Sequence, residues 1–156
     1  MRIIEQSELT AGQKARIVEL WNAEYPLTLA HRKDSEFDEY LNGLSRKRHF
    51  LLFGESDELI GWAITFDRDG GRWFAIIIDG RTKGKGYGTR LIDKLKETES
   101  RLFGWVIDHS NSLKLNGDRY ISPLGFYKKI GFSVCPGERI ENHKMSGVKI
   151  EWNALI

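Results

Sequence analysis

Residues 73–92 place the strongest constraint on this chain, because an apolar segment runs there through a basic, glycine-rich turn into an amphipathic segment, WFAIIIDGRTKGKGYGTRLI. A strand that ends in such a turn, followed directly by a helix, can direct several backbone N–H groups and the helix N-terminus at one anion. Glycine lets the anion approach because it has no Cβ, and Lys83 and Lys85 add positive charge. The segment therefore predicts a strand, a phosphate-binding turn and a helix.

Two common phosphate-binding motifs do not match this turn. The nucleoside-triphosphate loop requires two glycines separated by four residues, followed by Lys and then Ser or Thr. Here Gly80 and Gly84 are separated by three residues, and Lys85 is followed by Gly86. The dinucleotide motif Gly-x-Gly-x-x-Gly fails as well, since no third glycine stands at the required spacing. A nucleotide-binding module is therefore disfavoured.

Composition limits the class of protein. The chain has 156 residues, 40% of them hydrophobic and 29% charged, which are ordinary values for one soluble globular domain over residues 1–156. A net charge of +2 is too small to indicate a nucleic-acid partner. The single cysteine, Cys135, excludes an internal disulfide, and no apolar run approaches the ~20 residues of a membrane span. These features predict a cytoplasmic protein that binds neither nucleic acid nor a membrane.

Hydrophobic periodicity and turn residues predict the order of the elements. Helices are expected over residues 11–24 and 34–44, the second with a capping box formed by Ser35 and Asp38. Strands are expected over residues 2–5, 49–54, 59–66 and 72–79, with a hairpin turn at 69–71. After the glycine-rich turn, we expect a helix to residue 99, a strand over 102–107, a helix from Pro123 to Ile130, and strands over 132–135 and 149–153. This order predicts an α/β fold in which helices flank a central sheet of mixed strand direction.

Two motifs resemble the GNAT acyltransferase superfamily. Lys83-Gly-Lys-Gly86-Tyr-Gly88 is similar to the family's coenzyme A loop, Arg/Gln-x-x-Gly-x-Gly/Ala, with Lys at the first position; a register that begins at Arg81 also satisfies the formula. The segment FYKKIGF at 126–132 resembles the family's FYxKxGF motif and follows the loop at the family's spacing. The resemblance implies a single-domain GNAT fold and an N-acetyltransferase that depends on acetyl-coenzyme A.

The resemblance also implies roles for particular residues. Tyr127 is expected to protonate the coenzyme A thiolate as it leaves, and an amide of the strand at 76–78 is expected to hold the oxyanion. No metal site is expected, because the histidines and the cysteine lack paired spacing. The residues expected to bind acetyl-coenzyme A are Ile76, Ile77, Ile78, Lys83, Gly84, Lys85, Gly86, Tyr87, Gly88 and Thr89.

The sequence offers three candidates for the group that removes the proton from the attacking amine, and it also allows that no such group is needed. Asp108 and His109 follow the strand expected at 102–107, where an acceptor-side group would lie, and a histidine is readily poised near pH 7. Glu24, at the end of the first helix, is another candidate. Alternatively, the site lowers the pKa of the amine by desolvation and needs no base.

The chain departs from the family pattern at the contact to the pantetheine arm of the coenzyme. An asparagine usually makes this contact, and Tyr120 stands at its position here. Asn111 and Ser122 are the candidates to replace it.

The expected activity is transfer of an acetyl group from acetyl-coenzyme A to a primary amine by direct attack. Trp21, Tyr25 and His31, near the turn after the first helix, are expected to line the acceptor side. The sequence does not choose among small amines, amino acids, antibiotics and proteins as acceptors, or between a monomer and a homodimer. A non-catalytic acyl-coenzyme A sensor of the same fold is the alternative.

Overall fold

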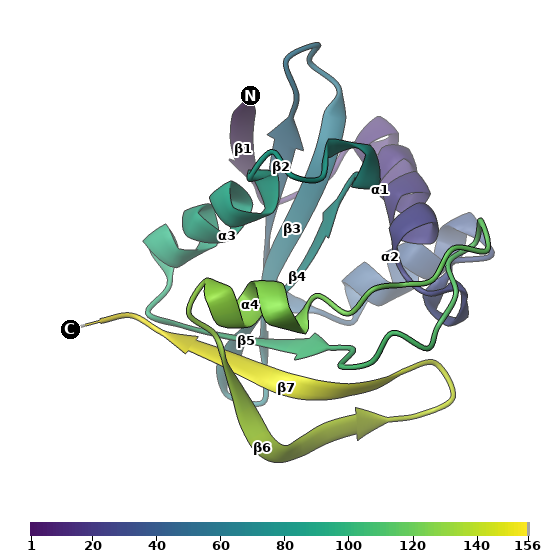
Figure 1. Cartoon of the computed structure of the whole chain (residues 1–156). Coiled ribbons are helices and arrows are strands. Elements are labelled where there is room, and N and C mark those ends of the chain that lie inside the picture. The colour runs from purple at the N-terminus through teal and green to yellow at the C-terminus, as the bar shows by residue number, and fades with distance from the viewer. Residues whose placement is uncertain (156) are drawn as a thin grey trace.

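One mixed sheet organises the computed structural model, which describes residues 1–155. Its strand order is β1-β2-β3-β4-β5-β7-β6, and every neighbouring pair is antiparallel except β4 and β5 (Figure 1). The expectation of an α/β fold with a sheet of mixed direction is confirmed. The strands are β1 (Arg2–Gln6), β2 (Ser45–Phe53), β3 (Leu59–Arg68), β4 (Gly71–Ile78), β5 (Arg101–Val106), β6 (Ser133–Glu141) and β7 (Ser146–Asn153).

Helices cover both faces of the sheet (Figure 1). They are α1 (Ala11–Glu24), α2 (Asp34–Asn42), α3 (Tyr87–Thr98) and α4 (Leu124–Lys129), with 3-10 turns η1 (Leu27–Leu29) and η2 (Gly80–Thr82). Because side chains alternate along a strand, Trp73 and Ile77 of β4 join one hydrophobic cluster with α1 and α2. Phe74 and Ile76 join the opposite cluster with α3 and α4. Within residues 1–155, no helix combines the length and the apolar character that crossing a membrane requires.

The sheet opens between its two parallel strands. Trp73 opposite Phe103 is the one paired position between β4 and β5 in the described chain, and the strands then diverge (Figure 1). The amide of Asp79 donates to Ile60 of β3 at 2.8 Å. Since backbone groups alternate sides along a strand, Ile76 and Ile78 direct their N–H and C=O groups away from β3, into this gap.

Two boundary predictions are corrected. The capping box of Ser35 and Asp38 is wrong, because α2 already begins at Asp34 and its N-cap, Lys33, makes no side-chain hydrogen bond. The strand expected over 132–135 extends to Glu141 as β6. Its Pro-Gly pair lies within a register shift between Val134 and Arg139, which an edge strand tolerates because one side needs no partner.

The hairpin turn before β4 is confirmed. Asp69 and Gly70 have φ angles of 49° and 76°, the left-handed values that a tight two-residue turn requires. Arg68 therefore pairs with Gly71, and the end of β3 lies beside the start of β4.

The buried His49 predicts an acid-sensitive fold. His49 is 2% exposed, its Nδ1 accepts from Trp62 Nε1 at 3.1 Å, and burial lowers its pKa to about 4. Between its ordinary pKa of about 6.5 and pH 4, the unfolded chain binds a proton at His49 that the folded chain does not. We therefore expect the free energy of unfolding to fall on acidification through this window, by up to ~1.4 kcal/mol per pH unit.

Urea denaturation at pH 7, 6 and 5 measures this slope. His49→Gln keeps an acceptor for Trp62 and is expected to flatten the slope. The pH dependence that remains is expected to come from His31, because burial lowers its pKa as well. Equal slopes in the two proteins would show that His49 is not responsible.

Candidate active site

A cavity of about 1340 Å³ occupies the gap between β4 and β5 and continues beneath α1 and α2. Ile76 and Ile78 of β4, Val106 of β5 and Tyr127 of α4 lie in its wall. Ligand sites commonly measure about 300–1,000 Å³. The cavity therefore has room for part of a coenzyme and a second small molecule.

The glycine-rich turn forms one end of this cavity. Gly84 and Gly86 have left-handed φ angles of 83° and 77°, and a Cβ at either position would project into open space. Gly86 is the N-cap of α3 and provides no side-chain hydrogen bond to the first amides of the helix. Lys83 and Lys85 are exposed and form no ion pair within residues 1–155. These features fit a diphosphate, which would accept hydrogen bonds from the backbone amides of the turn and from the two ammonium groups.

The two sequence motifs lie against each other. A Cβ on Gly88, in the first turn of α3, would lie 3.3 Å from the ring of Phe126 in α4. Phe126 is adjacent to Tyr127, so this close packing holds the tyrosine next to the glycine-rich turn. Of the ten residues expected to bind the coenzyme, Ile76, Ile77, Ile78, Lys83 and Gly84 line the cavity, while Lys85, Gly86, Tyr87, Gly88 and Thr89 continue the turn into α3.

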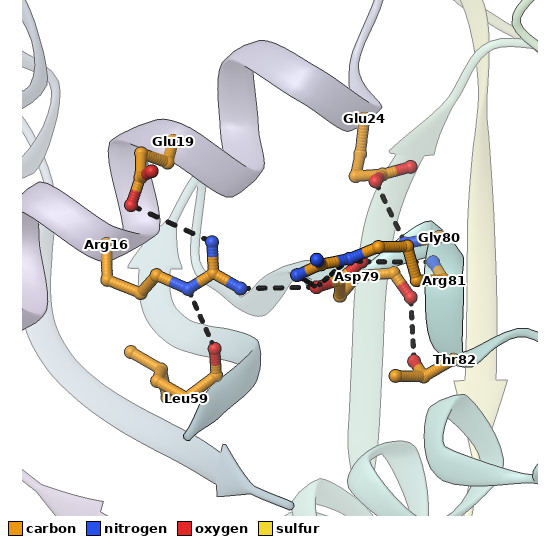
Figure 2. Close-up of polar contacts among 8 residues, drawn as sticks. All are labelled: Arg16, Glu19, Glu24, Leu59, Asp79, Gly80, Arg81 and Thr82. Carbon is orange, nitrogen blue, oxygen red and sulfur yellow. Dashed lines mark hydrogen bonds and ion pairs between the residues drawn. The ribbon is translucent and has the colours of Figure 1, made fainter.

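Asp79 anchors the start of the turn, as Figure 2 shows. Its carboxylate is buried and accepts hydrogen bonds from the Arg81 backbone at 3.0 Å, the Arg81 guanidinium at 2.7 Å and the Arg16 guanidinium of α1 at 3.1 Å. The hydrogen bonds from Arg81 lower the pKa of Asp79 to about 2. Thr82 donates to the Asp79 carbonyl at 2.7 Å. Neither Asp79 nor Arg16 was among the expected site residues, although an aspartate followed by glycine after a buried strand is a recognisable turn signal.

Glu24 connects three parts of the site. It lines the cavity from the end of α1, where one carboxylate oxygen accepts from the Gly80 amide at 2.9 Å (Figure 2). The other oxygen accepts from Lys114 at 3.2 Å, in the connection between β5 and α4. Glu24 therefore reaches the cavity, as the sequence suggested, but both oxygens already have donors.

Tyr127 lies in the cavity wall with its hydroxyl unoccupied by any hydrogen bond from residues 1–155. Its ring packs edge-on against Phe74 and Phe132, at centroid distances of 5.8 and 5.5 Å. Burial raises the pKa of the Tyr127 hydroxyl well above its ordinary value. The hydroxyl is therefore protonated at neutral pH and can donate into the cavity.

Tyr25 lies on the opposite side of the gap. Its hydroxyl donates to the carbonyl of Ile76 at 3.0 Å, and burial raises the pKa of this group. Trp21 packs on Tyr25 and His31, at centroid distances of 4.8 and 4.4 Å, and all three line the cavity. The structure thus brings the expected acceptor-side residues to the α1 and α2 side of the gap.

Asp108 and His109 lie outside the cavity wall. The Asp108 carboxylate accepts from the Arg139 guanidinium at 2.7 and 3.2 Å, and these hydrogen bonds lower its pKa. His109 Nδ1 accepts from the Asn111 amide at 3.1 Å. Their positions do not support a role as the base, because both groups face the local turn and the β6–β7 hairpin.

The two proposed replacements for the missing asparagine also differ in position. Ser122 lines the cavity, but its hydroxyl donates to the Ile107 carbonyl. Asn111 does not line the cavity, whereas Tyr120, which stands at the asparagine position, does.

Asp79→Asn is expected to lower the free energy of unfolding by about 2 kcal/mol, because it removes the charge of a buried carboxylate that accepts hydrogen bonds from Arg16 and Arg81, which themselves reach solvent. Asp38→Asn, which removes an exposed pair with Lys14 at 2.9 Å, is the matched control and is expected to cost less than ~1 kcal/mol. Urea denaturation at pH 7 measures both. The stabilisation by Asp79 is present above its ordinary pKa and is lost as the pH falls toward 2, so equal losses in the two variants at pH 7 would contradict the anchor role.

Comparison with known proteins identifies the family. A model described as the Acetyltransferase (GNAT) family matches residues 14–132. A search of curated proteins finds no match.

Several solved structures share the fold at low sequence identity. A phosphinothricin acetyltransferase from Sinorhizobium meliloti, in complex with acetyl-coenzyme A, has a TM-score of 0.67 and 12% identity over 98% of this chain and 89% of that chain. Escherichia coli ElaA has a TM-score of 0.69 and 17% identity over 98% and 100% of the two chains. A variant of the spermidine N-acetyltransferase SpeG from Vibrio cholerae has a TM-score of 0.66 and 16% identity over 98% and 95%. The family match covers most of the chain and includes the glycine-rich turn and Tyr127; the protein therefore belongs to the Acetyltransferase (GNAT) family and is an N-acetyltransferase that uses acetyl-coenzyme A.

Proposed function

We propose that the protein transfers the acetyl group to a primary amine by direct attack, with Tyr127 as the acid that protonates the departing thiolate. The observation that carries this proposal is the hydroxyl of Tyr127, which lies in the cavity wall beside β4 and has no hydrogen-bond partner among residues 1–155. A buried phenol with a raised pKa keeps its proton until a strong acceptor forms beside it.

The groups around the gap fit the coenzyme along its length. The amides of the glycine-rich turn with Lys83 and Lys85 would hold the diphosphate. The N–H of Ile76 and the N–H and C=O of Ile78 face the gap and would hold the pantetheine arm as an added strand is held, while the Ile76 carbonyl keeps its hydrogen bond from Tyr25. This arrangement brings the reacting end of the coenzyme toward Tyr127.

The coenzyme supplies an acetyl group activated as a thioester. An amide of the 76–78 segment would donate to the thioester carbonyl oxygen, where negative charge develops. The amine nitrogen forms the new C–N bond as the C–S bond breaks, and Tyr127 passes its proton to the sulfur. The proton that the amine releases then restores Tyr127, so the step needs no further acid.

The attacking amine must be neutral, although an ordinary alkylamine has a pKa of about 10.4. Glu24 has both oxygens engaged, and Asp108 and His109 lie outside the cavity. The amine would instead lose water as it enters the cavity beside Trp21 and Tyr25, and this desolvation disfavours the ammonium ion. We therefore favour desolvation of the amine over a dedicated base.

Tyr127→Phe is expected to leave acetyl-coenzyme A affinity within about twofold and to lower kcat by about 100-fold or more, because it removes only the proton donor. Gly86→Val is the complementary variant: a Cβ-branched residue at φ 77° distorts the turn, and the loss is expected in binding. Calorimetric binding and thiol release over an amine panel measure the two effects. Equal losses of affinity in both variants would mean that Tyr127 is structural.

Acetyl-coenzyme A at ~100 Kd is expected to stabilise the folded protein by about 2.7 kcal/mol, seen as a rise in Tm. ATP and NAD are the controls, and we expect neither to reproduce the rise, since the turn lacks both nucleotide motifs. Stabilisation by the coenzyme without transfer to any amine would instead support the non-catalytic sensor. A rise with all three ligands would contradict a coenzyme-specific site.

A further inference from the structure

Arg68 lies in the cavity wall at the end opposite the glycine-rich turn. Its guanidinium lies over the rings of Phe66 and Trp73, at 4.9 and 5.4 Å from their centroids. Within the described residues, no carboxylate lies within 4 Å of this group and no acceptor receives a hydrogen bond from it. Arg68 is therefore held in place by aromatic packing while its donors remain free.

The chemistry of this end favours an anion over a cation. A guanidinium presents its donors as a planar fork that matches a carboxylate. At this end, the rings of Phe66 and Trp73 already carry cations of the protein itself, because Arg68 lies over both and Lys149 lies over Trp73 at 5.3 Å. Lys144, in the turn between β6 and β7, also lines the cavity, but it is exposed, so Arg68 carries the argument.

The carboxylates of α2 do not neutralise this end. Glu36 lines the cavity but accepts from the Arg32 amide at 3.1 Å and lies 4.0 Å from His31. Glu39 also lines the cavity, but it is exposed, so water screens the charge of its carboxylate. Neither side chain forms an ion pair with Arg68.

The register of the sheet sets the distance between Arg68 and the reacting centre. The guanidinium folds back over Trp73, and Ile76 lies three positions further along β4. At ~3.3 Å per residue, the position of the guanidinium over Trp73 and the position of Ile76 are separated by about 10 Å along the strand. An α-amino acid is too short to place its carboxylate at Arg68 and its amine at Ile76.

We propose that the amine acceptor carries a carboxylate about 10 Å from its reacting nitrogen, and that Arg68 binds this carboxylate. The inference rests on the proposed acetyl transfer and specifies its acceptor class. Arg68 thus acts as a specificity residue that orients the acceptor, with its amine toward Ile76 and Tyr127.

Three acceptors test the inference. Triglycine in extended form separates its amine and carboxylate by about 10 Å; triglycinamide lacks the carboxylate charge, and glycine is too short. For the wild-type protein, kcat/KM for triglycine is expected to exceed that for triglycinamide and for glycine by about tenfold or more.

Substitution of Arg68 separates binding from folding. Arg68→Gln is expected to raise KM for triglycine about tenfold and to leave its kcat, and both parameters for triglycinamide, within about twofold. Arg68→Lys keeps the charge without the fork and is expected to retain part of the preference. Arg32→Gln removes an exposed arginine outside the cavity wall and is the matched control, with no change for either acceptor. The coenzyme-induced rise in Tm verifies that each variant is folded.

Equal kcat/KM for triglycine and triglycinamide in the wild type would overturn the inference, and so would a preference that survives Arg68→Gln. Acetylation of diamines but not of triglycine would overturn it as well, while the proposed acetyl transfer would stand. Absence of transfer to every amine in the panel, despite binding of the coenzyme, would overturn the proposed function itself and the inference with it.

Discussion

The divergence of β4 and β5 is the constraint on which the site depends. The strands are held together at Trp73 and Phe103, where packing is tight: a Cβ on Gly104 would lie 2.8 Å from the ring of Phe74. Beyond this point they share no ladder, so the carboxyl half of β4 has backbone groups on one side that β5 does not engage. A continuous sheet would have used those groups for a neighbouring strand and left no cavity.

The same gap allows two reactants to meet from opposite faces of the sheet. The glycine-rich turn and Tyr127, which we propose bind the coenzyme, lie on the α3 and α4 side. Trp21, Tyr25 and Arg68, which we propose line the acceptor side, belong to the α1 and α2 side. Direct transfer requires contact between the two, and only an opening through the sheet provides it. The hydrogen bond from Tyr25 to Ile76 joins the acceptor wall to the strand edge at this opening.

Much of the fold and the coenzyme end of the site follows from local patterns. Gly84 and Gly86 adopt left-handed backbone that glycine tolerates, and Tyr127 of the Phe126–Phe132 motif lies on a short helix, as its Pro and Gly boundaries predicted. The failures have physical causes as well. The capping box of Ser35 was wrong because the N-cap is Lys33, two residues earlier, so Ser35 lies inside the first turn of the helix. Asp108 was assigned to the acceptor side from its place after a strand, but Arg139, 31 residues away, holds it elsewhere.

By itself, the sequence determined that a basic, glycine-rich turn follows a buried strand, that a tyrosine motif follows at the family's spacing, and that both belong to an α/β fold. These features depend on the conformational preferences of glycine, on side-chain periodicity and on short motifs, which act between near neighbours. Only the tertiary structure decided which polar groups share the cavity and which are engaged elsewhere. Arg16 and Asp79, or Glu24, Gly80 and Lys114, come together across long stretches of chain. The availability of Arg68 and the occupation of Glu24 depend on such distant partners, because a charge is free to bind a ligand only where the fold leaves it without a counter-ion.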